Sequence, residues 1–137
     1  MMVSFLAVLV AAILGMIVRA LWYSPLFFGT LWMHLMGFGK KQCEAAKKKG
    51  LGKTYALAFL VVVVMSTVLA YLIQITALNS VAGAVALAAT LWLGFIATSF
   101  LNSILWEGKS FKLYLLNIAQ YLVVLMVMAL VLQIWPW

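Results

Sequence analysis

Acidic, cysteine and histidine residues are nearly absent from this chain. It has two acidic residues, Glu44 and Glu107, one cysteine, Cys43, and one histidine, His34. A single cysteine excludes an internal disulfide and a cysteine-based metal cluster, and so few potential ligands argue against a zinc or carboxylate metal site. No serine, histidine and acid constellation is apparent in the sequence. We therefore expect no metal site, no cofactor and no enzyme activity.

Charge of either sign is scarce as well. Charged residues make up 8% of the chain and hydrophobic residues 69%, whereas a soluble domain is about one quarter charged and about half apolar. No charged residue lies between Lys53 and Glu107, and none follows Lys112. Charge-free apolar stretches of about 18 residues or more are typical of membrane-spanning helices. The sequence thus predicts an all-α integral membrane protein, with residues 1–137 as one transmembrane domain.

Four spans are predicted, at about residues 2–22, 54–76, 81–106 and 111–135, packed as an antiparallel bundle. A short interfacial helix is expected at about 25–37, with Ser24 and Pro25 at its start and Gly37 or Gly39 at its end. At 1.5 Å per residue it would extend about 18 Å, which is too short to span a bilayer. Ser80 and Ser110 are in position to cap the third and fourth spans.

The basic residues indicate how the four spans are oriented. With four crossings, Arg19, six lysines of the loop at 38–53, Lys109 and Lys112 all fall on one side. Because basic loops stay in the cytoplasm, that side is predicted to be cytoplasmic, with both termini outside, in a plasma or inner membrane. The net charge of +7 therefore reflects topology and contact with anionic lipid headgroups. Nucleic-acid binding is not expected.

Small residues recur at every fourth position in two of the spans. Residues four apart share a helix face, and small side chains there let membrane helices approach closely. We therefore expect close helix packing, and self-association of the chain, through two stripes. The first is Ala7, Ala11 and Gly15, followed by Arg19; the second is Ala82, Ala86, Thr90 and Gly94, followed by Thr98, Asn102 and Trp106. By contrast, Ser66 and Thr67 are expected to bond to carbonyls of their own helix.

The predicted topology brings polar residues to a similar depth near the cytoplasmic side. One interpretation is structural, with Asn102 paired to Asn117 and Arg19 paired to Glu107 across helices. The other is a water-filled vestibule where Arg19 meets an anion, a headgroup or a small solute, unless its side chain extends to the headgroups. The candidate ligand or pore residues are Arg19, Thr98, Asn102, Glu107, Tyr114, Asn117 and Gln120.

Aromatic residues mark the expected membrane interfaces, where Trp and Tyr concentrate. His34 is expected to be a hydrogen-bonded interfacial residue, with a role as ligand or proton carrier as the alternative. The predicted interfacial residues are Trp22, Tyr23, Trp32, His34, Trp106 and Trp135.

Two blocks of sequence resemble a known family. The first is Gly15 with Leu21-Trp22-Tyr23-Ser24-Pro25-Leu26-Phe27-Phe28-Gly29 and Trp32; the second is Trp92-Leu93-Gly94-Phe95, Asn102 and Trp106-Glu107-Gly108-Lys109-Ser110. They are similar to the small membrane proteins grouped as domain of unknown function 1761 (DUF1761). The resemblance implies a four-helix membrane domain and no established activity, so it carries over no catalytic residue.

Three functions are then compatible with the sequence. The first is a homo-oligomer that binds or passes a small solute or ion through the cytoplasmic polar cluster. The second is an accessory or scaffold subunit of a larger membrane complex. The third, an enzyme acting on a lipid, is the weakest, because no paired acid and base lie inside the predicted spans.

Overall fold

The computed structural model describes residues 4–24, 26–37, 39, 41, 44–45, 48, 51–77 and 79–135, and every regular element among them is helical. These elements are α1 (Phe5–Trp22), α2 (Gly29–Met36), α4 (Leu51–Ile75), α5 (Val81–Leu91), the π-helix η1 (Trp92–Ala97), α6 (Thr98–Phe100), α7 (Asn102–Leu105) and α8 (Phe111–Ile134). Four helical stretches are long and apolar enough to cross a membrane: Phe5–Trp22, Gly52–Ile75, Val81–Leu105 and Phe111–Ile134. The predicted helical class and the four predicted apolar spans are confirmed.

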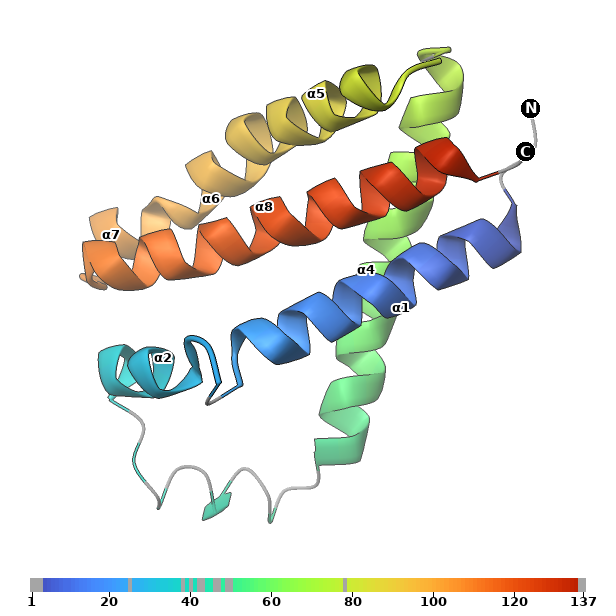
Figure 1. Ribbon diagram of the computed structural model, residues 1–137. Helices are drawn as coiled ribbons and strands as arrows, with labels where there is room; N and C mark the ends of the chain where they lie inside the picture. Colours follow the sequence, from blue (N-terminus) through green and yellow to red (C-terminus); the bar gives the residue numbers. More distant parts are fainter. Residues whose placement is uncertain are drawn as a thin grey trace.

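Three of the long stretches lie side by side as a layer with α8 in the middle (Figure 1). α1 packs on one side of α8, and α5 with η1 packs on the other. α4 crosses this layer and makes its main contact with α1, while its contact with α5 is small. This differs from the expected antiparallel bundle, because α4 crosses the other long helices instead of lying alongside them. The start of α1 and the end of α8 lie at one end of the layer, and α2 and α7 lie at the other.

The small-residue stripe of α1 forms the contact where α1, α4 and α8 meet. Ala7 and Ala11 are fully buried. A methyl group on Gly15 would lie 3.3 Å from side-chain atoms of both Val62 and Val124. Close approach of the three helices therefore depends on these small side chains.

Ser66 and Thr67, adjacent on α4, make different hydrogen bonds. The buried Ser66 hydroxyl donates to the carbonyl of Val8 on α1 at 3.0 Å, so the expected bond within its own helix is wrong. Thr67 donates to Val63 in its own helix at 2.8 Å, as predicted. The difference follows from the helix face, because Ser66 faces α1 whereas Thr67 is exposed.

The third span is not one regular α-helix, and its packed face is not the one expected. Ala84, Ala88 and Ala97 are its buried positions. The last of these is offset from the four-residue repeat because η1 adds a wider π turn. The predicted packing stripe lies on another face and is exposed to the outside of the chain at all four positions: Ala82, Ala86, Thr90 and Gly94. Both faces are rich in small residues, so spacing alone does not distinguish them.

The helix ends combine predicted and unpredicted features. Ser80 and Ser110 cap α5 and α8, accepting hydrogen bonds from the amides of Gly83 at 3.0 Å and Leu113 at 3.1 Å. Gly37 ends α2 with a positive φ of 73°. The predicted start of α2 at residue 25 is wrong.

Instead of capping α2, the Ser24 hydroxyl donates to the Leu21 carbonyl at 2.7 Å. The helix begins at Gly29, whose amide donates to the Ser24 carbonyl at 2.9 Å. The backbone passes so closely here that a methyl group on Gly29 would lie 2.3 Å from the Tyr23 carbonyl oxygen. The expectations for Pro25 and Cys43 concern positions outside the described residues.

Candidate functional site

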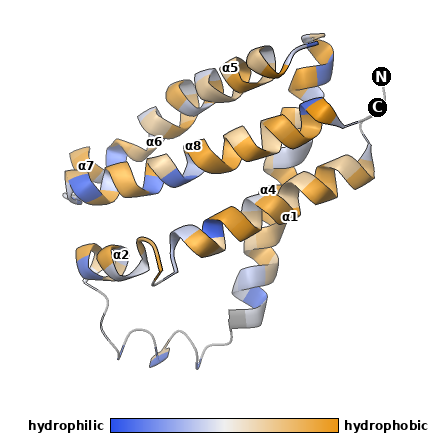
Figure 2. Ribbon diagram, in the orientation of Figure 1, coloured by the Kyte–Doolittle hydropathy of each residue, from blue (hydrophilic) through white to orange (hydrophobic). Residues whose placement is uncertain are grey.

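Polar side chains gather at the end of the layer where α1 stops and α8 starts. Figure 2 shows hydrophilic residues at this end, on α1, α7 and the first turns of α8, whereas the middles of the long helices are hydrophobic. α1 supplies Arg19, the turn after it supplies Tyr23, and α8 supplies Asn117 and Tyr121. Residues from helices far apart in the sequence therefore meet at one place.

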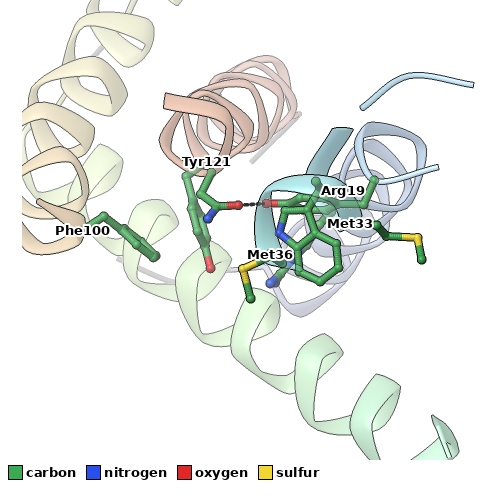
Figure 3. Close-up of a pocket in the computed structure, with 8 residues that line it drawn as sticks. Arg19, Met33, Met36, Phe100 and Tyr121 are labelled. Atoms are coloured by element: carbon green, nitrogen blue, oxygen red, sulfur yellow. Dashed lines mark hydrogen bonds between the residues drawn. The ribbon is translucent and has the colours of Figure 1, made fainter. Parts of the chain in front are cut away.

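This end contains a cavity of about 470 Å³, here called the Arg19 cavity (Figure 3). Ligand pockets commonly have volumes of about 300–1,000 Å³. Its lining residues come from α1, α2, α6 and α8 and the turn after α1. They are Arg19, Tyr23, Trp32, Met33, Met36, Phe100, Asn117 and Tyr121.

The Arg19 guanidinium has no acidic partner in the part of the chain that the structure describes. Its central carbon lies 5.6 Å from the centre of the Tyr121 ring, which is a cation–π contact. The expected ion pair with Glu107 is not among the contacts of the described residues, and Glu107 is exposed. The one positive charge of this cavity is thus held against an aromatic ring.

Tyr23 connects the end of α1 to α8 by a hydrogen bond. Its hydroxyl donates to Oδ1 of Asn117 at 2.8 Å, drawn in Figure 3, and lies 3.5 Å from Oε1 of Gln120. Burial raises the pKa of Tyr23 to about 12; the charge of Arg19 lowers it, and Tyr121 raises it further. The hydroxyl therefore keeps its proton at neutral pH and remains a donor.

Asn117 consequently pairs with Tyr23, and the expected pair with Asn102 is not found among the described residues. Gln120 is fully buried beside this bond, and its Nε2 has no hydrogen-bond partner among the residues that the structure describes. A buried donor of this kind costs about 1–3 kcal/mol. The Tyr23–Asn117 bond therefore lies next to a polar group that the surrounding protein leaves unsatisfied.

A second cavity of about 330 Å³, here called the Glu107 cavity, adjoins the first. The two share Met36, Phe100 and Asn117. The other lining residues of the Glu107 cavity are Ser99, Asn102, Ser103, Glu107, Lys109, Leu113 and Tyr114. Among the described residues, Lys109 and Glu107 are the charged residues that line the Glu107 cavity, and Arg19 is the charged residue that lines the Arg19 cavity.

Two side-chain hydrogen bonds attach the third span to α8 near these cavities. Within the third span itself, the backbone amide of Leu101 donates to the backbone carbonyl of Thr98, three residues back, at 3.2 Å. The carbonyl of Ala97 accepts a hydrogen bond from the Tyr114 hydroxyl at 2.6 Å. The Trp92 indole donates to the carbonyl of Ile118 at 2.6 Å. The irregular segment is thus fixed to α8 on both sides of the π turn.

The comparison with known protein families gives one result. A family model described as "Protein of unknown function (DUF1761)" matches residues 6–133. The chain belongs to the DUF1761 family. No curated protein and no solved structure matches it significantly.

In this DUF1761 protein the predicted site residues lie in four different surroundings. Arg19 and Asn117 line the Arg19 cavity, and Asn102, Glu107 and Tyr114 join Asn117 around the Glu107 cavity. Gln120 is buried behind Tyr23. Thr98 lines neither cavity: its hydroxyl donates to the Gly94 carbonyl at 2.7 Å, and its side chain is exposed.

The predicted interfacial residues also lie in different surroundings in the structure. Trp32 and Tyr23 line the Arg19 cavity, with their ring centres 5.7 Å apart. Trp22 contacts Phe28 at 4.5 Å between ring centres. Trp106 and His34 are exposed, and Trp135 packs against the hydrophobic core.

Four further lining residues of the Arg19 cavity were not among the predicted site residues. Tyr121 follows Asn117 by one helical turn, so its place on the same face was readable from spacing. No sequence signal places Met33, Met36 or Phe100 there, because their positions depend on how α2 and the irregular third span dock against α8.

Proposed function

We propose that this DUF1761 protein is a multi-pass membrane protein that binds a small organic anion in the Arg19 cavity, at the cytoplasmic side. The membrane location is supported by the four apolar helices and by large hydrophobic side chains on the outside of the chain, including Phe5, Phe95 and Ile134, each about 70% exposed. Exposure of such side chains to water is unfavourable, whereas the hydrocarbon of a bilayer removes them from water. The cytoplasmic assignment follows from the positive-inside rule.

The observation that supports anion binding is the state of Arg19. A guanidinium presents five N–H donors in a planar fork that matches carboxylate and phosphate oxygens. Among the described residues none of these donors is used in a hydrogen bond or ion pair, and the side chain faces a cavity. Asn117, held by Tyr23, lines the same cavity and adds a polar amide. The arrangement suits an anionic group placed between Arg19 and Asn117.

Purified protein in liposomes tests this proposal with a panel of probes: acetate, octanoate, benzoate and inorganic phosphate. Hydrogen bonds to charged groups contribute about 1.5–3 kcal/mol, so Arg19→Gln is expected to weaken binding of the preferred anion by about 10- to 100-fold. Lys112→Gln is the matched control, because Lys112 is an exposed cation at the same end that lines neither cavity. Equal binding by wild type and Arg19→Gln for every probe would refute the proposal.

Flux measurements on the same liposomes separate binding from transport. Arg19-dependent binding with flux at the level of empty liposomes indicates a binding protein. Flux that saturates with anion concentration and falls in Arg19→Gln indicates a transporter. The site is the same in both cases, and the rate determines which description applies.

We further propose that the chain self-associates through the exposed stripe Ala82, Ala86, Thr90 and Gly94. Its support is that the stripe faces away from the helices of its own chain, although small side chains suit close helix contact in lipid. In a Cys43→Ser background, Ala86→Cys is expected to form crosslinked dimers in membranes. The control is Ile13→Cys, at a lipid-exposed position of α1. Equal crosslinking at both positions argues against self-association through this stripe. Recovery of the protein with a stoichiometric partner protein would instead favour an accessory subunit.

A further inference from the structure

An apolar groove lies directly beside the Arg19 cavity. It has a volume of about 430 Å³ and runs between α4, the third span and α8. Val68 and Leu69 of α4, Phe95 of η1 and Leu125 of α8 are among its lining residues, and none of its lining residues is charged. The contact of α4 with α5 is small, and the groove lies between α4 and the part of the third span from Leu91 to Phe100.

Two aromatic residues, Phe100 and Tyr121, line both the groove and the Arg19 cavity. Their ring centres are 5.4 Å apart. Figure 3 shows Tyr121 between Phe100 on one side and Arg19 on the other, in agreement with the 5.6 Å cation–π contact. The groove and the cavity therefore adjoin at this aromatic pair, with a cation on one side and hydrocarbon side chains on the other.

We propose that the Arg19 cavity and this groove together bind an amphiphile that carries one anionic head and a hydrocarbon chain. The head pairs with Arg19 beside Asn117, and the chain passes the Phe100–Tyr121 pair and lies along Val68 and Leu69. This inference rests on the proposed anion site and names its ligand class. A free long-chain carboxylate and an anionic phospholipid share this chemistry.

The composition of the Arg19 cavity favours such a ligand over a small hydrated anion. Apart from Arg19, Tyr23 and Asn117, its lining is aromatic or thioether, with Trp32, Met33 and Met36 from α2. A small hydrated ion would lose its water against these side chains without replacement hydrogen bonds. Methionine side chains adapt to chains of different shape, so α2 suits contact with the ligand just below its head.

The energetics also predict which part of the ligand decides binding. Lipid tails already surround the protein, so a hydrocarbon chain gains little from leaving the bilayer for the groove. The Arg19 contact holds the chain beside the groove and so raises its local concentration there. A neutral amphiphile with the same chain is therefore expected to occupy the groove far less than an anionic one.

Photolabelling in nanodiscs of neutral phosphatidylcholine tests this. The probes are a long-chain fatty acid with a diazirine in its chain, the corresponding fatty alcohol, and phosphatidylglycerol carrying the same diazirine chain. The fatty acid or the phosphatidylglycerol is expected to label groove residues about tenfold more than the alcohol, the ratio given by one charge-assisted hydrogen bond. Arg19→Gln should reduce this labelling to the level of the alcohol, and Lys112→Gln should leave it unchanged.

A second variant tests the groove itself. Val68 lies at the groove and is 51% exposed, so Val68→Trp adds an indole there without repacking the core. It is expected to reduce chain labelling several-fold while Arg19-dependent binding of benzoate persists. Labelling by the free acid alone assigns a soluble amphiphile, and labelling by phosphatidylglycerol alone assigns a bilayer lipid; each supports the ligand class.

Two results would overturn the inference, and they differ in what they imply for the anion site. Equal labelling of the groove by acid and alcohol, with Arg19-dependent benzoate binding intact, refutes the amphiphile and leaves the anion site. Labelling and benzoate binding that are both unchanged in Arg19→Gln refute both proposals.

Discussion

Adding one methyl group to three glycines tests the packing at three contrasting places. Gly29→Ala places a Cβ 2.3 Å from the Tyr23 carbonyl oxygen and 2.7 Å from the Ser24 carbonyl carbon. Gly15→Ala places it 3.3 Å from side-chain atoms of Val62 and Val124. Gly94→Ala meets nothing within 4 Å. The chemical change is the same in all three, so any difference in stability comes from the surroundings.

The expected magnitudes follow from what each methyl group meets. At Gly29 the neighbours are backbone atoms that cannot rotate away, so overpacking costs about 1–3 kcal/mol. Displacing the chain also breaks the bond from the Gly29 amide to Ser24, which contributes about 1 kcal/mol. At Gly15 the valine side chains can yield, so a loss of about 0–2 kcal/mol is expected after the helix-propensity gain. At Gly94 that gain, up to about 1 kcal/mol, stands alone.

Unfolding in mixed micelles, followed by far-ultraviolet circular dichroism as SDS is added, measures these differences. Size-exclusion chromatography selects the monomer, so that contacts between copies do not contribute. Gly29→Ala is expected to destabilise the protein most, and Gly15→Ala less. Gly94→Ala is expected to be as stable as wild type or more stable. A loss at Gly94 as large as that at Gly29, or a Gly29 variant within about 0.5 kcal/mol of wild type, would refute the close backbone approach after α1.

Three other perturbations follow from single hydrogen bonds. Ser66→Ala removes the buried bond to α1 and should cost about 1 kcal/mol in SDS unfolding, whereas Thr67→Ala removes a bond within its own helix and should cost close to nothing. Tyr114→Phe should destabilise by a similar amount and speed hydrogen exchange around the π turn. Burial raises the pKa of Tyr23 from 10.0 to about 12, so the stabilising contribution of its protonated hydroxyl is complete below pH 10 and is lost as the pH rises through 12. Tyr23→Phe should abolish this loss of stability. Tyrosinate absorbance measures the titration, and SDS unfolding at each pH measures the stability.

The spans and several of their ends could be predicted because composition and local chemistry determine them. A long run without charge has few alternatives to a membrane helix. The caps at Ser80 and Ser110 depend only on adjacent residues. The start of α2 was mispredicted because Ser24 is followed by proline, a pattern typical of a helix start. In the structure its hydroxyl bonds backward to Leu21, and the close passage at Gly29 delays the helix.

What could not be predicted depends on contacts between helices. The third span has alanines on more than one face, so a four-residue repeat does not say which face packs. The π turn at Trp92–Ala97 explains why the third buried position is Ala97, which is offset from the four-residue repeat of Ala84 and Ala88. The crossing of α4 is likewise invisible in its own sequence, because its exposed and buried faces are both apolar.

The polar cluster illustrates the same division. The sequence placed Arg19 and Asn117 at the same end of the helices, because the position of each is counted from the end of its own span. Their partners were not predictable, because the pairing is decided by Tyr23, which reaches Asn117 from 94 positions away in the sequence. Tyr121 takes the position beside Arg19 that the sequence had suggested for Glu107.

The contact of Arg19 with Tyr121 does not satisfy its guanidinium. A cation–π contact contributes about 0.5–2 kcal/mol, but it uses the face of the guanidinium and leaves the five N–H donors at its edge. If the four helices span a membrane as proposed, these donors need oxygen partners, because an unsatisfied charge inside a membrane helix is costly. Of the polar side chains around Arg19, the Asn117 amide and the Tyr23 hydroxyl are already bonded to each other. In the proposed function, an anion that enters the cavity supplies the oxygen partners that these donors lack among the described residues.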